Sequence, residues 1–174
     1  RECMKKYIAV AGNIAVGKSA LTTLLSEHLY WEAVHSVVTD NPYLPDFSRD
    51  KQRWSFHYQV YYLARRLRYH RQSVERPGTV IQDRTVYEDA EIWAQSLYEQ
   101  GYMAERDWQT YWDLYETVVT ILPPPDLLIY LEASESVLRK RIEQRGRDLE
   151  RQMTQDYLSR ISALYRTWMG QFDL

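Results

Sequence analysis

The sequence predicts an α/β fold in which helices flank one parallel sheet. Short apolar runs, partly β-branched, alternate with longer segments whose apolar residues recur at helical spacing. Continuous apolar runs are typical of strands buried on both faces, as in parallel sheets. A glycine-rich loop stands between the first apolar run and the first helical segment. This alternation favours α/β architecture, with ligands bound beyond the carboxyl ends of the strands.

Four short apolar runs are the expected strands. Gly12 closes the first of them, and Asp83 follows the third. Val37-Val38 is a weaker candidate for a further strand. The four expected strands are Tyr7–Ala11, Trp31–Val34, Thr79–Gln82 and Leu127–Leu131.

Six segments are expected to be helical. Pro77-Gly78 ends the longest of them, and Pro123-Pro124-Pro125 is a stiff break before the last strand. Gly101 and Gly146 separate neighbouring helices. The expected helices are Lys18–His28, Lys51–Ser73, Tyr87–Glu99, Glu105–Leu122, Ser134–Arg145 and Gln152–Trp168.

Length and composition narrow the class of protein. The 174 residues predict a single domain over 1–174, and a net charge of −2 provides no general attraction to a nucleic-acid polymer or a membrane. Cys3 is the single cysteine, which excludes a disulfide framework and suits a reducing, cytoplasmic location. No apolar run is long enough to span a bilayer, and no signal peptide is recognisable. The 15 tyrosines and 6 tryptophans predict either a packed helical core or a site that stacks flat ligands.

The glycine-rich loop has the pattern GxxxxGK[ST] between a strand and a helix. Its backbone N–H groups can surround phosphate oxygens, Lys18 can bridge the β- and γ-phosphates, and the Ser19 hydroxyl can ligate Mg²⁺. No guanine-reading Asn-Lys-x-Asp string occurs, which argues against a GTPase. The expected nucleotide-binding residues are Gly12, Asn13, Ile14, Ala15, Val16, Gly17, Lys18, Ser19 and Ala20.

Two carboxylates and one arginine near the strands are candidates for the chemistry. Glu32 can accept the proton of a hydroxyl acceptor, although its spacing also fits a solvated loop glutamate. Asp83 ends an apolar strand, where it can reach a Mg²⁺ shell through water. Arg84 can hold a phosphate or a substrate oxygen. The alternative for Asp83 and Arg84 is an N-cap and a salt bridge at the next helix.

Arginines flank Gly146 in a pattern that suits a mobile lid. Arg141 and Arg145 share one helix face and can neutralise charge on a transferred phosphoryl group, with Arg147 beyond the glycine. The alternative is a solvated basic face paired with Glu143 or Glu150.

Gln59, Arg66 and Asp89 are candidates for an acceptor pocket. An amide can make two hydrogen bonds to a base edge, and an Arg–Asp pair can fix orientation. Residues 59 and 66 share one face of the long expected helix. Taken alone, all three residues also fit ordinary surface polarity.

These motifs, in this order, resemble the deoxynucleoside kinase family, particularly the bacterial deoxyadenosine and deoxyguanosine kinases. The similarity covers nearly the whole chain. It is carried by Gly12–Ser19, Glu32-Ala33-Val34, Asp40-Asn41-Pro42-Tyr43-Leu44, Arg53-Trp54-Ser55-Phe56 with Gln59, Asp83-Arg84-Thr85-Val86-Tyr87-Glu88-Asp89, Leu97-Tyr98-Glu99, Asp107-Trp108 and Arg141–Arg147.

The resemblance implies a P-loop kinase fold of about five parallel strands with an arginine-rich lid. It implies transfer of the γ-phosphoryl group of ATP, with Mg²⁺, to the 5′-hydroxyl of a deoxynucleoside, with deoxyadenosine as the first choice. Deoxyguanosine and deoxycytidine are the alternatives within the family. A homodimer packed through the long helices is also implied.

The resemblance also implies a role for each candidate residue. Glu32 would be the general base, and Arg84 would hold the 5′-oxygen, with Lys18, Arg141 and Arg145 acting on the phosphates. Glu150 would hold the 3′-hydroxyl. Gln59, Arg66 and Asp89 would read the base, which would lie against Phe56, Tyr58 and Trp93.

Four features depart from the family pattern. Ala15 replaces a glycine, which is tolerable unless the position requires a positive φ. Ala33 replaces a proline, and Ser48 replaces a tyrosine that would contact the 3′-hydroxyl. The chain stops at Leu174, so we expect the last strand of the family's sheet to be missing.

Two other functions remain open at this point. A nucleoside monophosphate kinase would share the phosphate loop and the lid but bind an acceptor phosphate. A non-catalytic nucleotide-binding module would need neither a base nor a lid. Most aromatic residues of the long helices are expected in the core or an interface rather than in the site.

Overall fold

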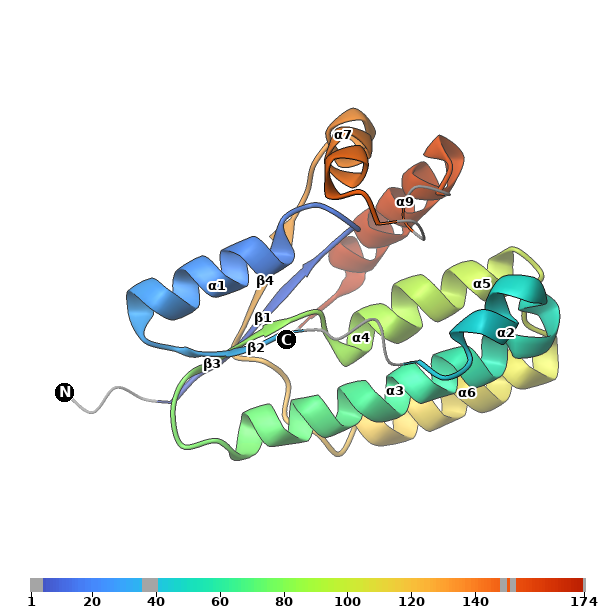
Figure 1. The fold of residues 1–174 in the computed structure, drawn as a ribbon. Helices are drawn as coiled ribbons and strands as arrows, with labels where there is room; N and C mark the ends of the chain where they lie inside the picture. The colour runs from blue at the N-terminus through green and yellow to red at the C-terminus, as the bar shows by residue number, and fades with distance from the viewer. Residues whose placement is uncertain (1–4, 36–40, 148–149, 151–152, 174) are drawn as a thin grey trace.

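The computed structural model describes residues 5–35, 41–147, 150 and 153–173. Four parallel strands form one sheet in the order β2-β3-β1-β4, which confirms the predicted fold class (Figure 1). The strands are β1 (Tyr7–Gly12), β2 (Glu32–Val34), β3 (Val80–Asp83) and β4 (Leu127–Leu131). All four predicted strands are therefore present within a residue of their expected bounds. The weaker candidate Val37-Val38 lies outside the described residues.

Helices cover both faces of the central strands. Every residue of β1 and β3 is buried, as expected for continuous apolar runs. On one face Ile8, Val10 and Ile81 pack against Leu21 and Leu25 of α1 (Lys18–Leu29). The opposite face is covered by α3 (Lys51–Glu75), which Figure 1 shows below the sheet, and by α9 (Gln155–Gln171).

The remaining helices are α2 (Leu44–Arg49), α4 (Val86–Glu88), η1 (Asp89–Ala94), α5 (Gln95–Glu99), α6 (Glu105–Val119) and α7 (Glu135–Arg145). The short helix α2 was not predicted. The expected helix Tyr87–Glu99 exists but contains a π-helical turn, η1. Helix α6 ends three residues before the predicted Leu122, because Pro123 restricts the backbone that precedes it.

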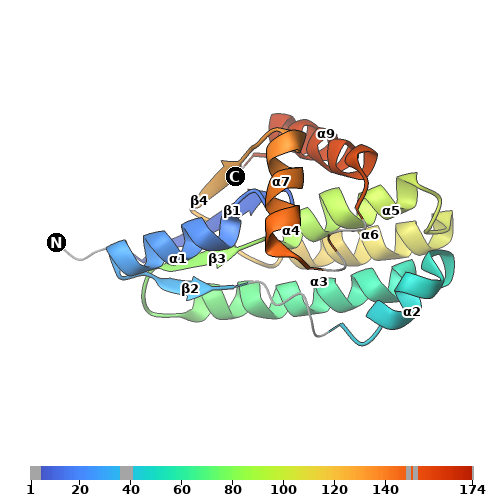
Figure 2. The same ribbon diagram turned by 45° about the horizontal axis from the view of Figure 1, so that its top comes forward.

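The long helices α3 and α6 lie side by side in both views, and α4 and α5 lie above them (Figures 1 and 2). Their shared core contains Leu63, Ala90, Ile92, Tyr111 and Tyr115, together with Tyr165 of α9. The aromatic residues of α6 therefore belong to the core, as expected. Those of α3 that were expected there, Trp54, Tyr58, Tyr61, Tyr62 and Tyr69, are half-buried outside it. Within the described residues, no helix combines the length and apolar character needed to cross a membrane.

Candidate active site

The carboxyl ends of β1 and β3 lie side by side and carry the predicted phosphate loop. Val10 pairs with Asp83 in the parallel register, so Gly12 and Asp83 lie at the same edge of the sheet. Gly12 begins the loop with φ +147, and a Cβ atom there would stand 2.6 Å from the Leu131 carbonyl oxygen. The close approach of β4 therefore requires glycine at this position.

Lys18 folds back onto its own loop. Its Nζ donates hydrogen bonds of 2.8 Å to the carbonyl oxygens of Gly12 and Asn13. Burial, followed by the charge of Arg84, lowers the pKa of Lys18 to about 7. Phosphate oxygens of a bound nucleotide would replace these carbonyls and favour the charged ammonium group.

Asn13 anchors the phosphate loop to α9. Its Nδ2 donates to the Leu158 carbonyl oxygen at 3.2 Å and to the Ser162 hydroxyl at 2.9 Å. Its Oδ1 accepts the N–H of Ile14 at 2.7 Å. The side chain of Asn13 is thus occupied by the protein, and only its backbone remains to line a phosphate site.

Ala15 adopts a left-handed backbone conformation with φ +60. Alanine therefore replaces the family's glycine at a position that does require a positive φ. A Cβ atom in this conformation costs roughly 1–2 kcal/mol relative to the right-handed region. Ala15 is nevertheless buried against Leu138 and Ile142 of α7, which offsets part of this cost.

Ser19 and Asp83 form the candidate magnesium site. The Ser19 hydroxyl donates a short hydrogen bond to Oδ2 of Asp83. Oδ1 of Asp83 is buried and has no hydrogen-bond partner within the described residues. Hydroxyl and carboxylate oxygens are the donors that Mg²⁺ prefers, so this pair fits a cation carried by a nucleotide.

The structure contradicts the predicted role of Glu32. Glu32 begins β2 and pairs with Val80, which in turn pairs with Tyr7 at the amino end of β1. The phosphate loop starts five residues further along β1, roughly 16 Å away at 3.3 Å per residue. Glu32 is exposed and forms an ion pair with Arg76. The prediction of Glu32 as general base is therefore wrong, because its carboxylate lies at the opposite end of the sheet.

Arg84 follows Asp83 in a strained conformation directly beside the loop. Its φ is +68, and its N–H donates to the Val10 carbonyl oxygen at 3.0 Å. Its guanidinium carbon lies 4.5 Å from the centre of the Trp93 ring. Burial would lower the pKa of this guanidinium, but Tyr165 and nearby carboxylates raise it above its usual value. Those carboxylates belong to Glu88, Asp89 and Asp83.

The N-cap of α4 is Thr85, not Asp83. The Thr85 hydroxyl accepts the N–H of Glu88, and the Glu88 carboxylate accepts the N–H of Thr85, which completes a capping box. Asp83 and Arg84 are therefore not needed to start the helix, and both remain available to the site.

Glu88 is a site residue that the sequence reasoning missed. It is completely buried, and its Oε1 accepts the N–H of Gly12 at 3.1 Å and the Tyr165 hydroxyl at 2.6 Å. One carboxylate thus joins the phosphate loop, the segment after β3 and helix α9. The Thr-x-x-Glu spacing of residues 85–88 was the available signal, since it is typical of a capping box.

The buried face of α3 is mostly polar. Leu63 is the one apolar member of a stripe that also contains Ser55, Gln59, Arg66, His70 and Ser73. Such a face is unusual unless the polar groups are paired or meet a ligand. Arg66 Nε lies 2.8 Å from Asp89 Oδ2 in an ion pair whose side chains are each 5% exposed. Burial raises the pKa of Asp89, while Arg66 opposes this shift.

Gln59 and Trp93 present further buried polar atoms on the same two helices as this ion pair. Gln59 Oε1 and Trp93 Nε1 are buried and have no hydrogen-bond partner within the described residues. Asp89 and Trp93 both belong to η1, and π-helical turns frequently occur at functional sites. The structure therefore places Gln59, Arg66 and Asp89 in the buried interior. This excludes the alternative that they are ordinary polar residues of the surface.

Two further residues assigned to the pocket also lie on α3. Phe56 is half-buried against the core that contains Trp93. Tyr58 stacks on Phe47 of α2 with ring centroids 4.1 Å apart, and its hydroxyl lies 3.4 Å from that of Tyr62. Ser48 is exposed, and its hydroxyl donates to the Leu44 carbonyl oxygen instead of facing the site.

The arginine segment divides into two groups. Arg141 Nη1 donates to the Val16 carbonyl oxygen at 2.7 Å, and Arg145 lines the same cavity of about 400 Å³ beside the loop. Arg147 pairs with Glu150 at 3.2 Å, as the alternative reading had expected. Oε2 of Glu150 is buried without a partner within the described residues. Gly146 ends α7 with φ +67, so the segment beyond it leaves the helix.

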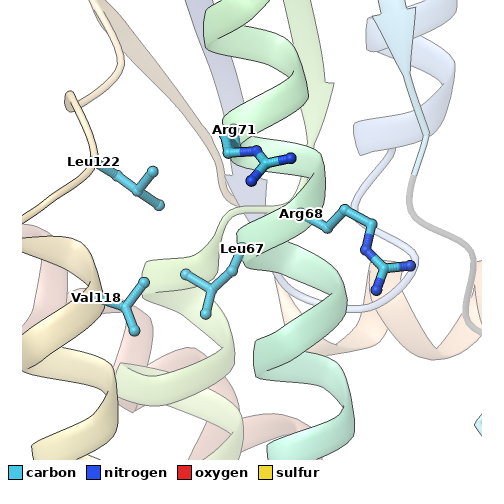
Figure 3. Close-up of a pocket in the computed structure, with 5 residues that line it drawn as sticks. All are labelled: Leu67, Arg68, Arg71, Val118 and Leu122. Atoms are coloured by element: carbon cyan, nitrogen blue, oxygen red, sulfur yellow. The ribbon is translucent and has the colours of Figure 1, made fainter.

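A second cavity lies away from this site, between α3 and the end of α6. It has a volume of about 440 Å³ and is lined by Leu67, Arg68, Arg71, Val118 and Leu122. Figure 3 shows Leu67 and Val118 pointing toward one another from the two helices. The cavity is apolar with a basic rim and contains none of the predicted site residues.

A phosphate loop at the edge of a parallel sheet, with an arginine and buried carboxylates beside it, defines a nucleotide-binding phosphotransferase of the α/β class. Residues 8–174 match the model of the deoxynucleoside kinase family. The deoxyadenosine/deoxycytidine kinase of Bacillus subtilis (strain 168) is 40% identical over 168 residues, which are 95% of this chain and 77% of the relative. The deoxyguanosine kinase of Lactobacillus johnsonii is 32% identical over 175 residues, which are 95% of this chain and 77% of the relative.

Solved structures agree with this result. A structure of deoxyadenosine kinase from M. mycoides with the products dCMP and a flexible dCDP bound superposes with a TM-score of 0.84 at 30% identity. It covers 95% of this chain and 84% of its own. The same enzyme with bound dATP has a TM-score of 0.82 at 30% identity, covering 94% and 84%. The chain belongs to the deoxynucleoside kinase family.

Proposed function

We propose that the protein transfers the γ-phosphoryl group of ATP to the 5′-hydroxyl of a deoxynucleoside, with deoxyadenosine as the preferred acceptor. The observation that carries this proposal is the position of Arg84. Its N–H bonds to Val10, two residues before the phosphate loop, and its guanidinium carbon lies 4.5 Å from the ring centre of Trp93, which shares η1 with the buried Asp89. One guanidinium thus connects a phosphate site with a buried polar pocket.

The donor end uses the loop and the arginines of α7. Lys18 leaves the carbonyl oxygens of Gly12 and Asn13 and binds the β- and γ-phosphates. Arg141 and Arg145, beside the cavity at the loop, neutralise charge on the transferred group. Mg²⁺, held by Ser19 and Asp83, would offset phosphate charge when the nucleotide is bound.

Asp83 takes the role that the sequence had suggested for Glu32. The bond between the γ-phosphorus and ADP breaks, a bond to the 5′-oxygen forms, and the hydroxyl proton moves to Asp83. Oδ1 of Asp83 has the free lone pairs that this step needs, and Oδ2 is left to Ser19 and, through water, to the Mg²⁺ shell. Arg84 holds the 5′-oxygen during the transfer.

The acceptor base lies between α3 and η1. The Gln59 amide and the Arg66–Asp89 pair supply donors and acceptors for its polar edge, and Phe56, Tyr58 and Trp93 contact its rings. Glu150 accepts the 3′-hydroxyl through its free oxygen. These residue types suit adenine, whose edge offers one amino donor beside a ring nitrogen acceptor.

Deoxycytidine is the second candidate acceptor. Cytosine presents the same amino donor beside a ring nitrogen, so the amide and ion pair can bind either base. The 40% identical relative from B. subtilis is named a deoxyadenosine/deoxycytidine kinase, which favours this choice over deoxyguanosine.

The decisive experiment incubates the purified protein with ATP·Mg²⁺ and each of the four deoxynucleosides, with dAMP as a further acceptor. We expect phosphorylation of deoxyadenosine, then of deoxycytidine. Transfer to dAMP alone would establish a nucleoside monophosphate kinase, and ATP binding without any transfer would establish a binding module.

A matched pair of variants tests the assignment of the proton acceptor. Asp83→Asn should lower kcat by roughly 10²-fold or more, since both the proton acceptor and a metal ligand are lost. Glu32→Gln should leave kcat unchanged, because Glu32 lies at the far end of the sheet. A loss of turnover in Glu32→Gln with normal turnover in Asp83→Asn would contradict the assignment.

We also propose a homodimer that covers the cavity between α3 and α6, in a single-domain cytoplasmic enzyme. The apolar lining of that cavity and the exposed Leu114 and Ile121 support such packing. Light scattering should report twice the monomer mass, and Val118→Glu should reduce it to that of the monomer.

A further inference from the structure

The backbone of Arg84 has a conformation that is sterically unfavourable for a residue with a side chain. Its φ of +68 places it in the left-handed region, where a Cβ atom meets steric opposition. Such conformations persist when the surroundings fix them, and they cluster at functional sites. The contacts that hold Arg84 therefore decide where its guanidinium points.

Two hydrogen bonds fix the main chain of Arg84. Its N–H donates to the Val10 carbonyl oxygen at 3.0 Å, which continues the pairing of β3 with β1. Its carbonyl oxygen accepts Nε2 of Gln82 at 2.9 Å. The first bond belongs to the sheet, whereas the second depends on one side chain.

The amide of Gln82 can adopt only one orientation. Its Oε1 accepts the Tyr7 hydroxyl at 3.2 Å and the Ser73 hydroxyl at 3.0 Å. Gln82 is 1% exposed, so no solvent competes for either end. Because the Arg84 carbonyl oxygen can only accept, the NH₂ group must face it, and the two hydroxyls, which can donate, face Oε1.

We propose that Gln82 is a positioning residue, which holds the Arg84 backbone in the left-handed conformation that places the guanidinium over Trp93. Tyr7 of β1 and Ser73 of α3 orient the amide, and Gln82 of β3 passes that orientation to Arg84. This inference rests on the proposed role of Arg84 in phosphoryl transfer.

A double-mutant cycle on kcat tests the proposal. Gln82→Met keeps the length of the side chain and removes the amide, and it should lower kcat about tenfold while KM for ATP changes less than about twofold. In an Arg84→Ala background the same substitution should change kcat less than about twofold, because the guanidinium that Gln82 positions is already absent. Losses in Tm should instead add across the two substitutions.

Matched controls separate positioning from general damage to the core. Tyr7→Phe and Ser73→Ala each remove one donor to Oε1 and leave Nε2 on the Arg84 carbonyl. Each should lower Tm but change kcat less than about threefold. If Gln82→Met does not fold, Gln82→Asn takes its place in the test. Gln82→Asn shortens the side chain by one methylene group and should show the same loss of kcat.

Several outcomes would overturn the inference without touching the proposed function. One is a normal kcat in both Gln82 variants while Arg84→Ala is inactive. Another is a loss of kcat from Gln82→Met that is equally large in the wild-type and the Arg84→Ala background. A crystal structure provides a test that needs no turnover: Arg84 should leave the left-handed region in Gln82→Met, and a φ still near +68 would refute the proposal. Absence of phosphorylation by the wild-type protein would instead refute the proposed function.

Discussion

The Tyr165 hydroxyl donates a hydrogen bond of 2.6 Å to Oε1 of Glu88, deep in the core. The same oxygen accepts the N–H of Gly12, the first residue of the phosphate loop. Helix α9 is bound to that loop a second time through Asn13, which donates to Leu158 and Ser162. The phosphate site is therefore assembled from three segments that are far apart in the sequence.

Removing the Tyr165 hydroxyl should weaken this assembly. Tyr165→Phe leaves a buried carboxylate oxygen with one donor fewer, which should cost about 1–3 kcal/mol of unfolding free energy. Urea unfolding provides the measurement. Tyr130→Phe is the control, because Tyr130 stacks on Tyr165 but is only half-buried, and it should cost less than about 0.5 kcal/mol. Equal losses in the two variants would contradict the importance of the Glu88 contact.

Lys18 should gain a proton when a nucleotide binds above neutral pH. Burial and the charge of Arg84 lower the pKa of Lys18 to about 7, so at pH 8.5 the free protein carries mostly the neutral amine. Bound phosphates favour the charged form, and binding should take up about one proton. Calorimetry of ATP binding in two buffers with different ionisation enthalpies measures this uptake.

The control for proton uptake is Lys18→Arg. A guanidinium remains charged at pH 8.5, so its binding of ATP should take up no proton. Equal uptake in the wild-type protein and this variant would show that another group gains the proton. The same depressed pKa should make the unfolding free energy of the nucleotide-free protein rise between pH 7 and 10.5, where the folded state binds fewer protons.

Features that are contiguous in the sequence were predictable, and those set by strand register were not. The phosphate loop lies within one motif, so the positions of Lys18 and Ser19 follow from spacing alone. The error at Glu32 arose because a three-residue strand does not reveal which of its ends a polar residue occupies. Asp83 ends a longer apolar run, and its position was correct.

Side-chain networks were the other limit of sequence reasoning. Glu88 and Gln82 act on residues across the sheet and on α9, and no local spacing indicates those partners. The polar stripe of α3 was only partly recognised, because Gln59 and Arg66 have helical spacing whereas their burial depends on η1. The left-handed conformations of Ala15 and Arg84 were not predictable, because neither residue is glycine, the residue type that usually marks a positive φ.

Ala15→Gly should be nearly neutral for stability. Relief of the left-handed strain gains roughly 1–2 kcal/mol, while the lost methyl group and the greater freedom of the unfolded chain cost a similar amount. We expect a change of less than about 0.5 kcal/mol in urea unfolding. Ala20→Gly, in the helical first turn of α1, should lose about 0.5–1 kcal/mol. Comparable losses at both positions would contradict strain at Ala15.

His70 should make the protein sensitive to acid. It is fully buried, its Nε2 donates to the Pro123 carbonyl oxygen at 2.7 Å, and burial lowers its pKa despite that bond. Because the folded-state pKa lies below the unfolded value, the folded state binds fewer protons, and unfolding free energy should fall as pH drops below about 6.5.

His70→Gln removes this titration while its amide can still donate to the Pro123 carbonyl. The variant should lose less stability than the wild-type protein between pH 7.5 and 5, measured by urea unfolding at both pH values. His28→Gln is the control for loss of an imidazole as such, since His28 is exposed on α1. Equal losses of stability in His70→Gln and the wild-type protein over this range would show that other groups cause the acid sensitivity. In that case the burial of neutral His70, on α3 against the loop before β4, would not limit stability.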